Sequence, residues 1–201
     1  MKLHVGCGTK KLEGWINIDS VANCNPDLIH DLAQPLPYED CSADALMAHG
    51  VIEHFDKYMR YCVFGEWARV LKVGGTIDLE LPDFQKLLSR FNKFDYDGFV
   101  DTFFGENMWN GEIYIGHFGN HKWGYSKSSL SAFAKKFGIE PVEVKTKGLN
   151  IHFIGKKVKH VSLAEMDQWV IHSHNNKFGA STDRMTLAQA KLKINEFNRN
   201  L

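Results

Sequence analysis

The sequence of 201 residues lacks the features that would place it in a membrane, a nucleic-acid or a disulfide-rich class. No apolar run approaches the roughly 20 residues that cross a bilayer, and no apolar signal region follows the first residues, so we expect a cytoplasmic protein without a membrane span. Lysine plus arginine equals aspartate plus glutamate, at 24 each, which gives no overall attraction for nucleic acid or an anionic membrane. The four cysteines form no Cys-x-x-Cys pair, which disfavours a zinc knuckle or a redox dithiol.

Metal-ligand patterns are also scarce. His117 and His121 have the i, i+4 spacing of a helical metal site, but Gly116, Gly119 and Gly124 disfavour a helix there. No acidic residue follows at the spacing of a His-Glu-x-x-His site. We therefore predict no metal.

What the sequence does contain is an alternation of short apolar runs with turn signals, which is typical of buried parallel strands joined by crossovers. Strands are predicted at 3–5, 16–19, 28–31, 43–48 and 76–81, and a hairpin at 142–146 and 151–157. Helices are predicted at 57–71, ended by Gly74 and Gly75, and at 126–137, ended by Gly138. These elements predict one α/β domain over 1–160, with an aromatic-rich insertion or lid at 83–125. A C-terminal extension is predicted at 161–201, with two helices at 163–172 and 186–197.

The first strand leads into a pattern that suits a nucleoside ligand. Gly6, Cys7 and Gly8 follow the strand, where glycines let the backbone approach a ligand, and Asp19 ends the next strand, where a carboxylate can accept hydrogen bonds from both ribose hydroxyls. Asp19 follows Gly8 by only eleven residues (19 minus 8). A dinucleotide fingerprint needs a full helix and an acid about 20 residues further on, so the spacing disfavours a nicotinamide oxidoreductase. A tight turn without a ligand is the simpler alternative.

Three further elements follow in order. Asp31 and Leu32 come at the end of the third strand, His49 to His54 leave the fourth strand, and Glu66 to Gly75 form a helix and a double-glycine turn. Together with the glycine pattern, they resemble the class I S-adenosylmethionine-dependent methyltransferases, in particular the methyltransferase type 11-like group. The resemblance covers residues 1–83 well and 116–157 more loosely.

The resemblance implies a Rossmann-like seven-stranded, mostly parallel sheet of order 3-2-1-4-5-7-6, with a shortened first crossover. It also implies S-adenosyl-L-methionine as cofactor and S-adenosyl-L-homocysteine as product. The residues that it assigns to cofactor binding are Gly6, Cys7, Gly8, Asp19, Asp31, Leu32 and His49. Cys7 departs from the family pattern, because a small residue is often found between the two glycines.

The acceptor side is less defined. His54 and His121 are the candidate general bases, each with a structural role as the alternative, and the aromatic residues of 83–125 form either an acceptor pocket or core. We predict a small-molecule, saccharide or surface-polymer precursor as acceptor, and a non-catalytic interaction module as the alternative. The resemblance implies that an enzyme methylating amino groups of nucleic-acid bases would have an Asn-Pro-Pro-Tyr-like run after the fourth strand. This run is absent, which disfavours that reaction and leaves other RNA chemistry as an alternative. Residues 161–201 form a solvated surface, a homodimer contact or a substrate clamp.

Overall fold

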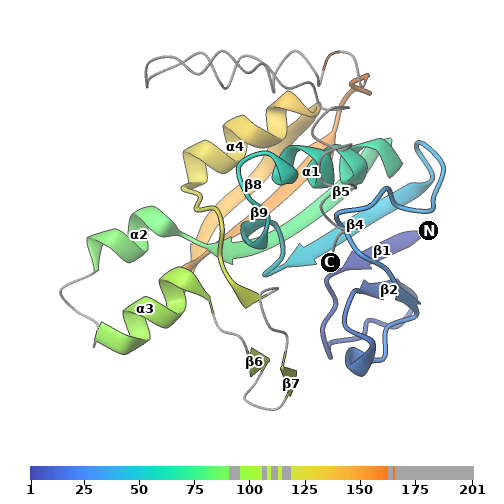
Figure 1. The fold of residues 1–201 in the computed structure, drawn as a ribbon. Helices are drawn as coiled ribbons and strands as arrows, with labels where there is room; N and C mark the ends of the chain where they lie inside the picture. Colours follow the sequence, from blue (N-terminus) through green and yellow to red (C-terminus); the bar gives the residue numbers. More distant parts are fainter. Residues whose placement is uncertain (91–95, 106–107, 110–112, 115–118, 163–164, 166–201) are drawn as a thin grey trace, which may run out of the picture.

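The computed structural model describes residues 1–90, 96–105, 108–109, 113–114, 119–162 and 165. Its main feature is a seven-stranded sheet (Figure 1), whose strands are β1 (Lys2–Val5), β2 (Ile16–Asp19), β3 (Leu28–Ile29), β4 (Ala43–His49), β5 (Leu71–Pro82), β8 (Ile139–Lys147) and β9 (Asn150–Lys157). The strand order is β3-β2-β1-β4-β5-β9-β8, parallel from β3 to β5 and antiparallel from β5 to β8. This is the predicted order 3-2-1-4-5-7-6, which is therefore confirmed.

Two helices, α1 (Met59–Val70) and α4 (Lys127–Lys136), lie side by side on one face of the sheet (Figure 1). Their contact is aromatic: the ring of Phe64 on α1 lies 5.0 Å from the rings of both Phe133 and Phe137, and all three side chains are buried. Aromatic pairs at this distance add to the stabilisation from burial itself. The hydrophobic core therefore lies between this helix pair and the sheet.

The opposite face of the sheet is polar, as β5 shows. Ile77, Leu79 and Leu81 point into the core, whereas Asp78 and Glu80 between them point to the other face and are half-buried. This alternation has the period of two expected for a strand with one buried face. β5 is thus buried on its core face and half-buried on the other.

The described residues between β5 and α4 form four short elements: α2 (Phe84–Ser89), α3 (Tyr96–Phe104), β6 (Met108–Trp109) and β7 (Ile113–Tyr114). The helices α2 and α3 lie near the end of β5 and the start of β9, at the edge of the sheet where β1 and β4 also end (Figure 1). The described part of the predicted insertion at 83–125 is therefore next to the carboxyl ends of the parallel strands, where open α/β sheets bind ligands.

The double glycine has a different role from the predicted one. Helix α1 ends at Val70 and β5 begins at Leu71, so Gly74 and Gly75 lie inside the strand rather than at a helix stop. A Cβ on Gly75 would come within 3.0 Å of the backbone oxygen of Asp44 on β4. The pairing of β4 with β5 also shifts register near this point. Glycine is thus needed for the close approach of two backbones at a bulge.

Other boundaries follow the sequence more closely. Ser126 caps α4 by accepting a hydrogen bond from the backbone of Ser129, and the two residues form a capping box. The hairpin of β8 and β9 closes through Gly148 and Leu149. The predicted third strand is too long, because β3 ends at Ile29.

The two predicted C-terminal helices lie outside the described residues, apart from Glu165, so the extension at 161–201 stays a prediction. Among the residues that the structure describes, none of the helices combines the length and apolar character that a membrane crossing requires.

Candidate active site

A cavity opens at the carboxyl ends of β1, β2 and β4. Its lining is mostly apolar and includes two carboxylates. The lining residues are Gly6, Gly8, Asp19, Ser20, Val21, Cys24, Asp31, Leu32, Gly50, Val51, His54 and Phe55.

Asp19 faces the glycine bend, and its carboxylate helps to hold that bend. Its Oδ2 accepts a hydrogen bond from the backbone N–H of Gly8 at 2.8 Å, and its Oδ1 accepts one from Val21 at 2.9 Å. Each carboxylate oxygen has two lone pairs, so both oxygens keep the capacity to accept a further hydrogen bond. The arrangement leaves an ordered acceptor at the wall of the cavity.

Gly6 brings the bend after β1 against the turn after β4. Its φ of 64° lies in the left-handed region, which glycine adopts at low cost. A Cβ at this position would lie 2.4 Å from Cγ2 of Val51, which is far inside van der Waals contact. The two turns that line the cavity are therefore in direct contact, and a side chain at position 6 would push them apart.

Asp31 and Leu32 also line the cavity. Leu32 is buried, while Asp31 is exposed and accepts a hydrogen bond from the backbone of Ala33 through Oδ1. A buried apolar side chain beside an exposed carboxylate suits the ring face and the amino edge of an adenine.

Two residues that the resemblance assigns to cofactor binding do not line this cavity. Cys7 is buried and its thiol donates a hydrogen bond to the carbonyl of Gly8. Burial, and then the negative charge of Asp19, raises the pKa of this thiol to about 11, so it stays protonated. His49 points to the polar face of the sheet, where its Nε2 lies 3.0 Å from Asp78 Oδ1.

His54 and His121, which are 67 positions apart in sequence, come together at the edge of the cavity. Their ring centroids are 4.9 Å apart. Burial, and then the proximity of His121, lowers the pKa of His54 to about 4. Burial also lowers the pKa of His121. Both imidazoles are therefore neutral at pH 7 and can accept a proton.

Glu53 is a third member of this group, and the sequence did not single it out. It is fully buried, its Oε2 has no hydrogen-bond partner among the described residues, and burial raises the pKa of its carboxyl to about 8. Its backbone carbonyl accepts hydrogen bonds from the N–H groups of Lys122 and Trp123, which ties the turn after β4 to the segment that carries His121. A buried neutral acid thus lies beside two neutral imidazoles.

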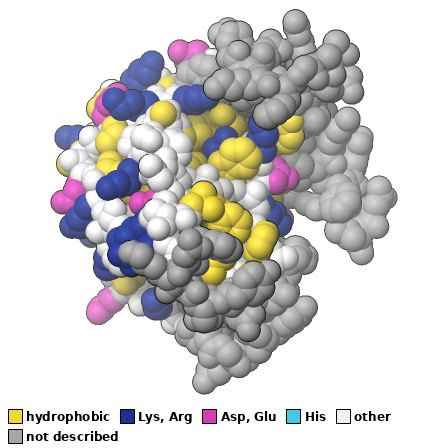
Figure 2. Space-filling model, turned by 90° about the vertical axis from the view of Figure 1, so that its left-hand side faces the viewer, with side chains coloured by type: hydrophobic (Ala, Val, Ile, Leu, Met, Phe, Trp, Pro, Cys, Tyr) yellow, Lys and Arg dark blue, Asp and Glu magenta, His cyan; other side chains and the backbone are white. Residues whose placement is uncertain are grey.

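A second hollow lies beside His121. Its lining is largely aromatic and consists of Phe84, Phe103, Phe104, His121, Lys122, Trp123 and Gly124. Figure 2 views the molecule from the side where α2 and α3 lie, and shows hydrophobic side chains gathered on that face beside lysine and arginine. Because His54 lines the first cavity and His121 the second, the histidine pair joins the two.

Two groups of described residues have the composition and proximity to hold a metal ion. One is Glu53 with His54 and His121, and the other is His49 with Asp78 and His152. In each group the candidate ligand atoms lie within 4.8 Å of one another.

The geometry agrees with comparisons to known proteins. A family model described as a methyltransferase domain matches residues 13–78. A solved S-adenosylmethionine-dependent methyltransferase from Methanosarcina mazei superposes with a TM-score of 0.58 at 17% identity, over 78% of this chain and 92% of that one. The chain therefore has the fold of the class I S-adenosylmethionine-dependent methyltransferases, and residues 13–78 match the model of a methyltransferase domain. Such domains use S-adenosylmethionine as methyl donor and release S-adenosylhomocysteine.

Two further similar structures of methyltransferases contain the product. The 1,6-didemethyltoxoflavin-N1-methyltransferase of Burkholderia thailandensis, solved with 1,6-didemethyltoxoflavin and S-adenosylhomocysteine, has a TM-score of 0.52 at 13% identity, over 79% of this chain and 71% of that one. The magnesium protoporphyrin IX methyltransferase of Synechocystis, solved with S-adenosylhomocysteine, has a TM-score of 0.52 at 12% identity, over 78% and 74%. No curated protein matches this sequence significantly. At these identities, the structural likeness establishes the fold and leaves the acceptor open.

Proposed function

We propose that this methyltransferase domain is catalytically active and transfers a methyl group from S-adenosylmethionine to a small-molecule or saccharide acceptor, including precursors of surface polymers. The observation that carries the proposal is the pair of hollows joined by His54 and His121. One hollow has the lining expected for adenosine, and the other has the apolar, aromatic lining typical of a small-molecule site.

The residues present fit the cofactor. Asp19 would accept hydrogen bonds from the ribose hydroxyls, Gly6 and Gly8 would let the backbone approach the ligand, and Asp31 with Leu32 would hold the adenine. A Cβ at position 6 would disturb this wall, as the contact with Val51 shows. When bound, the cofactor supplies an electrophilic methyl group on a sulfonium, so the protein needs only to orient the acceptor, exclude water and accept a proton where the acceptor must lose one.

The proton acceptor in the proposal is His54. Its Nδ1 lies 3.2 Å from the backbone carbonyl of Asn120, and a carbonyl only accepts, so Nδ1 is the donor of this hydrogen bond. In the tautomer protonated at Nδ1, the lone pair of Nε2 would take a proton from the acceptor. His121, at the boundary of the aromatic hollow, would orient the acceptor or share this role.

A calorimetric titration with S-adenosylhomocysteine tests the cofactor part of the proposal. We expect binding in the native chain and a loss of affinity of at least about 100-fold in Asp19→Ala, because two hydrogen bonds to a charged group contribute about 1.5–3 kcal/mol each. Glu39→Ala is the matched control, because Glu39 is an exposed carboxylate outside the cavity. Equal affinity in both variants would contradict the assignment of Asp19.

The acceptor part is tested separately by the release of S-adenosylhomocysteine in the presence of small-molecule and saccharide panels. For a responsive acceptor, His54→Ala should lower turnover while leaving the affinity for S-adenosylhomocysteine unchanged. Binding of the product without turnover of any acceptor would favour the non-catalytic interaction module instead.

The equal numbers of acidic and basic residues disfavour nucleic acid as the acceptor. We place the protein in the cytoplasm, where S-adenosylmethionine is present. A homodimer through residues 161–201 is part of the proposal, and light scattering of the full chain would measure it.

A further inference from the structure

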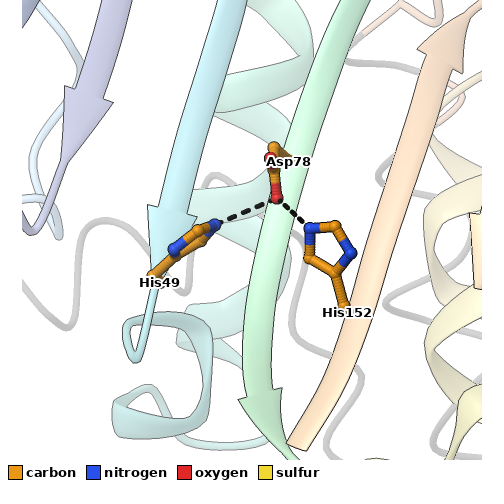
Figure 3. Close-up of side chains that lie close together, drawn as sticks. All are labelled: His49, Asp78 and His152. Carbon is orange, nitrogen blue, oxygen red and sulfur yellow. Dashed lines mark hydrogen bonds and ion pairs between the residues drawn. The ribbon is translucent and has the colours of Figure 1, made fainter. Parts of the chain in front are cut away.

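Three side chains from three neighbouring strands meet on the polar face of the sheet, outside the cavity described above. They are His49 on β4, Asp78 on β5 and His152 on β9, and Figure 3 shows both imidazoles turned toward one carboxylate. Asp78 Oδ1 lies 3.0 Å from Nε2 of His49 and 3.1 Å from Nε2 of His152. The register explains the meeting, because both histidines lie directly opposite Glu80, on either side of β5, and Asp78 is two residues away on the same face.

We propose that these three residues bind a divalent transition-metal ion. Imidazole and carboxylate are ligands that zinc and its neighbours accept, and three protein ligands leave at least one position open for water or another molecule. Tetrahedral zinc with bonds of about 2.0–2.1 Å needs ligand atoms roughly 3.3 Å apart. The two nitrogen-to-oxygen distances are close to this value, and all three ligand atoms lie within 4.8 Å of one another.

The surroundings fit a metal ligand as well. A histidine that binds a metal through one ring nitrogen usually directs the other toward a carboxylate, which fixes its orientation. Nδ1 of His152 is buried and has no hydrogen-bond partner among the described residues, and it lies 3.6 Å from Oε1 of Glu143. Lys145, the positive group next to Glu143, is already paired with that carboxylate at 2.7 Å.

The third acidic group near this cluster, Glu80, also has partners. Glu80 accepts hydrogen bonds from Lys147 and Asn150, each at 3.0 Å. The nearby lysine charges are thus offset by carboxylates, and Asp78 remains the carboxylate directed at both imidazoles.

The site is reachable and adjoins the cofactor cavity without being part of it. The side chains of His49, Asp78 and His152 are 36%, 30% and 17% exposed, so an ion has access. His49 directly precedes Gly50, which lines the cavity and whose N–H donates to the carbonyl of Glu80 at 2.7 Å. An ion bound by these three side chains would therefore link the end of β4 to β5 and β9. This inference does not depend on the proposed methyl transfer.

Zinc binding to the metal-stripped full chain tests the inference by calorimetry. We expect one zinc ion per chain at this site, at least about 100-fold weaker binding in His152→Ala and Asp78→Asn, and roughly 10–100-fold weaker binding in Glu143→Gln. His160→Ala is the matched control, because His160 is exposed and outside both clusters. Its affinity should equal that of the native chain.

A second readout separates binding from folding. Saturating zinc should raise the thermal midpoint of the native chain and of His160→Ala but not that of His152→Ala, and the midpoints without zinc show that each variant folds. Two results would overturn the inference: no zinc binding by the native chain, or binding that survives in His152→Ala and disappears in His121→Ala. The second result would assign the ion to the other cluster.

Discussion

The contact between Gly6 and Val51 gives the sharpest quantitative prediction, because one atom pair determines its size. In Gly6→Ala the new Cβ would lie 2.4 Å from Cγ2 and 3.2 Å from Cγ1 of Val51, but 3.4 Å from its Cβ. The backbone at position 6 would also hold an alanine at a φ of 64°. The left-handed conformation costs about 1–2 kcal/mol, and overpacking about 1–3 kcal/mol. We therefore expect Gly6→Ala to lower the free energy of unfolding by about 2–5 kcal/mol.

Val51→Ala provides the matched test, because it removes both clashing methyl groups and leaves an ordinary contact at 3.4 Å. In that background, Gly6→Ala should cost only the backbone part, about 1–2 kcal/mol. Urea unfolding of the four proteins, followed by tryptophan fluorescence, should then give a coupling energy of about 1–3 kcal/mol in favour of the double variant. The affinity for S-adenosylhomocysteine should fall in Gly6→Ala and recover in part in the double variant. Additive costs, within about 0.5 kcal/mol, would refute the contact.

Three other predictions concern buried or capping groups. The pKa of Glu53 rises from 4.5 to about 8 on folding, so the stability linked to its protonation is complete below pH 4.5 and is lost as pH rises through 8. Between pH 6.5 and 8 the native chain should therefore lose about 1.6 kcal/mol relative to Glu53→Gln in urea titrations. Lys157 is 1% exposed and donates to the carbonyls of Ala68, in the last turn of α1, and of Leu71, so Lys157→Met should cost about 2–4 kcal/mol in the same assay, whereas the exposed neighbour Lys156→Met should cost little. Ser126→Ala should lower the thermal midpoint by an amount equivalent to about 1 kcal/mol, because it removes the cap of α4.

The fold could be predicted where local patterns determine it. The strand ends at Gly6 and Asp19, the cap at Ser126 and the two-residue turn of the hairpin each depend on residues close together in sequence. The double glycine was misread for the opposite reason. Gly75 is required by the backbone of Asp44 on another strand, and local pattern contains no information about that neighbour.

In the candidate site, too, the residue types can be predicted from the sequence, whereas their contacts depend on the fold. The sequence nominated His54 and His121 separately, and only the fold brings their rings together. Glu53 reads in sequence as an ordinary turn acid, because its burial depends on the segment that follows α3. The cluster of His49, Asp78 and His152 has spacings of 29 and 74 residues, which match no metal motif, so only strand register reveals it.

The binding of the cofactor in the cavity beside Asp19 is best tested by a crystal structure of the chain grown with S-adenosylhomocysteine. We expect electron density for the adenosine across the ends of β1 and β2, with both sugar hydroxyls within hydrogen-bonding distance of the carboxylate of Asp19 and the base against Leu32. Density for the ligand elsewhere, or a cavity that stays free of it at saturating concentration, would show that this cavity is not the cofactor site.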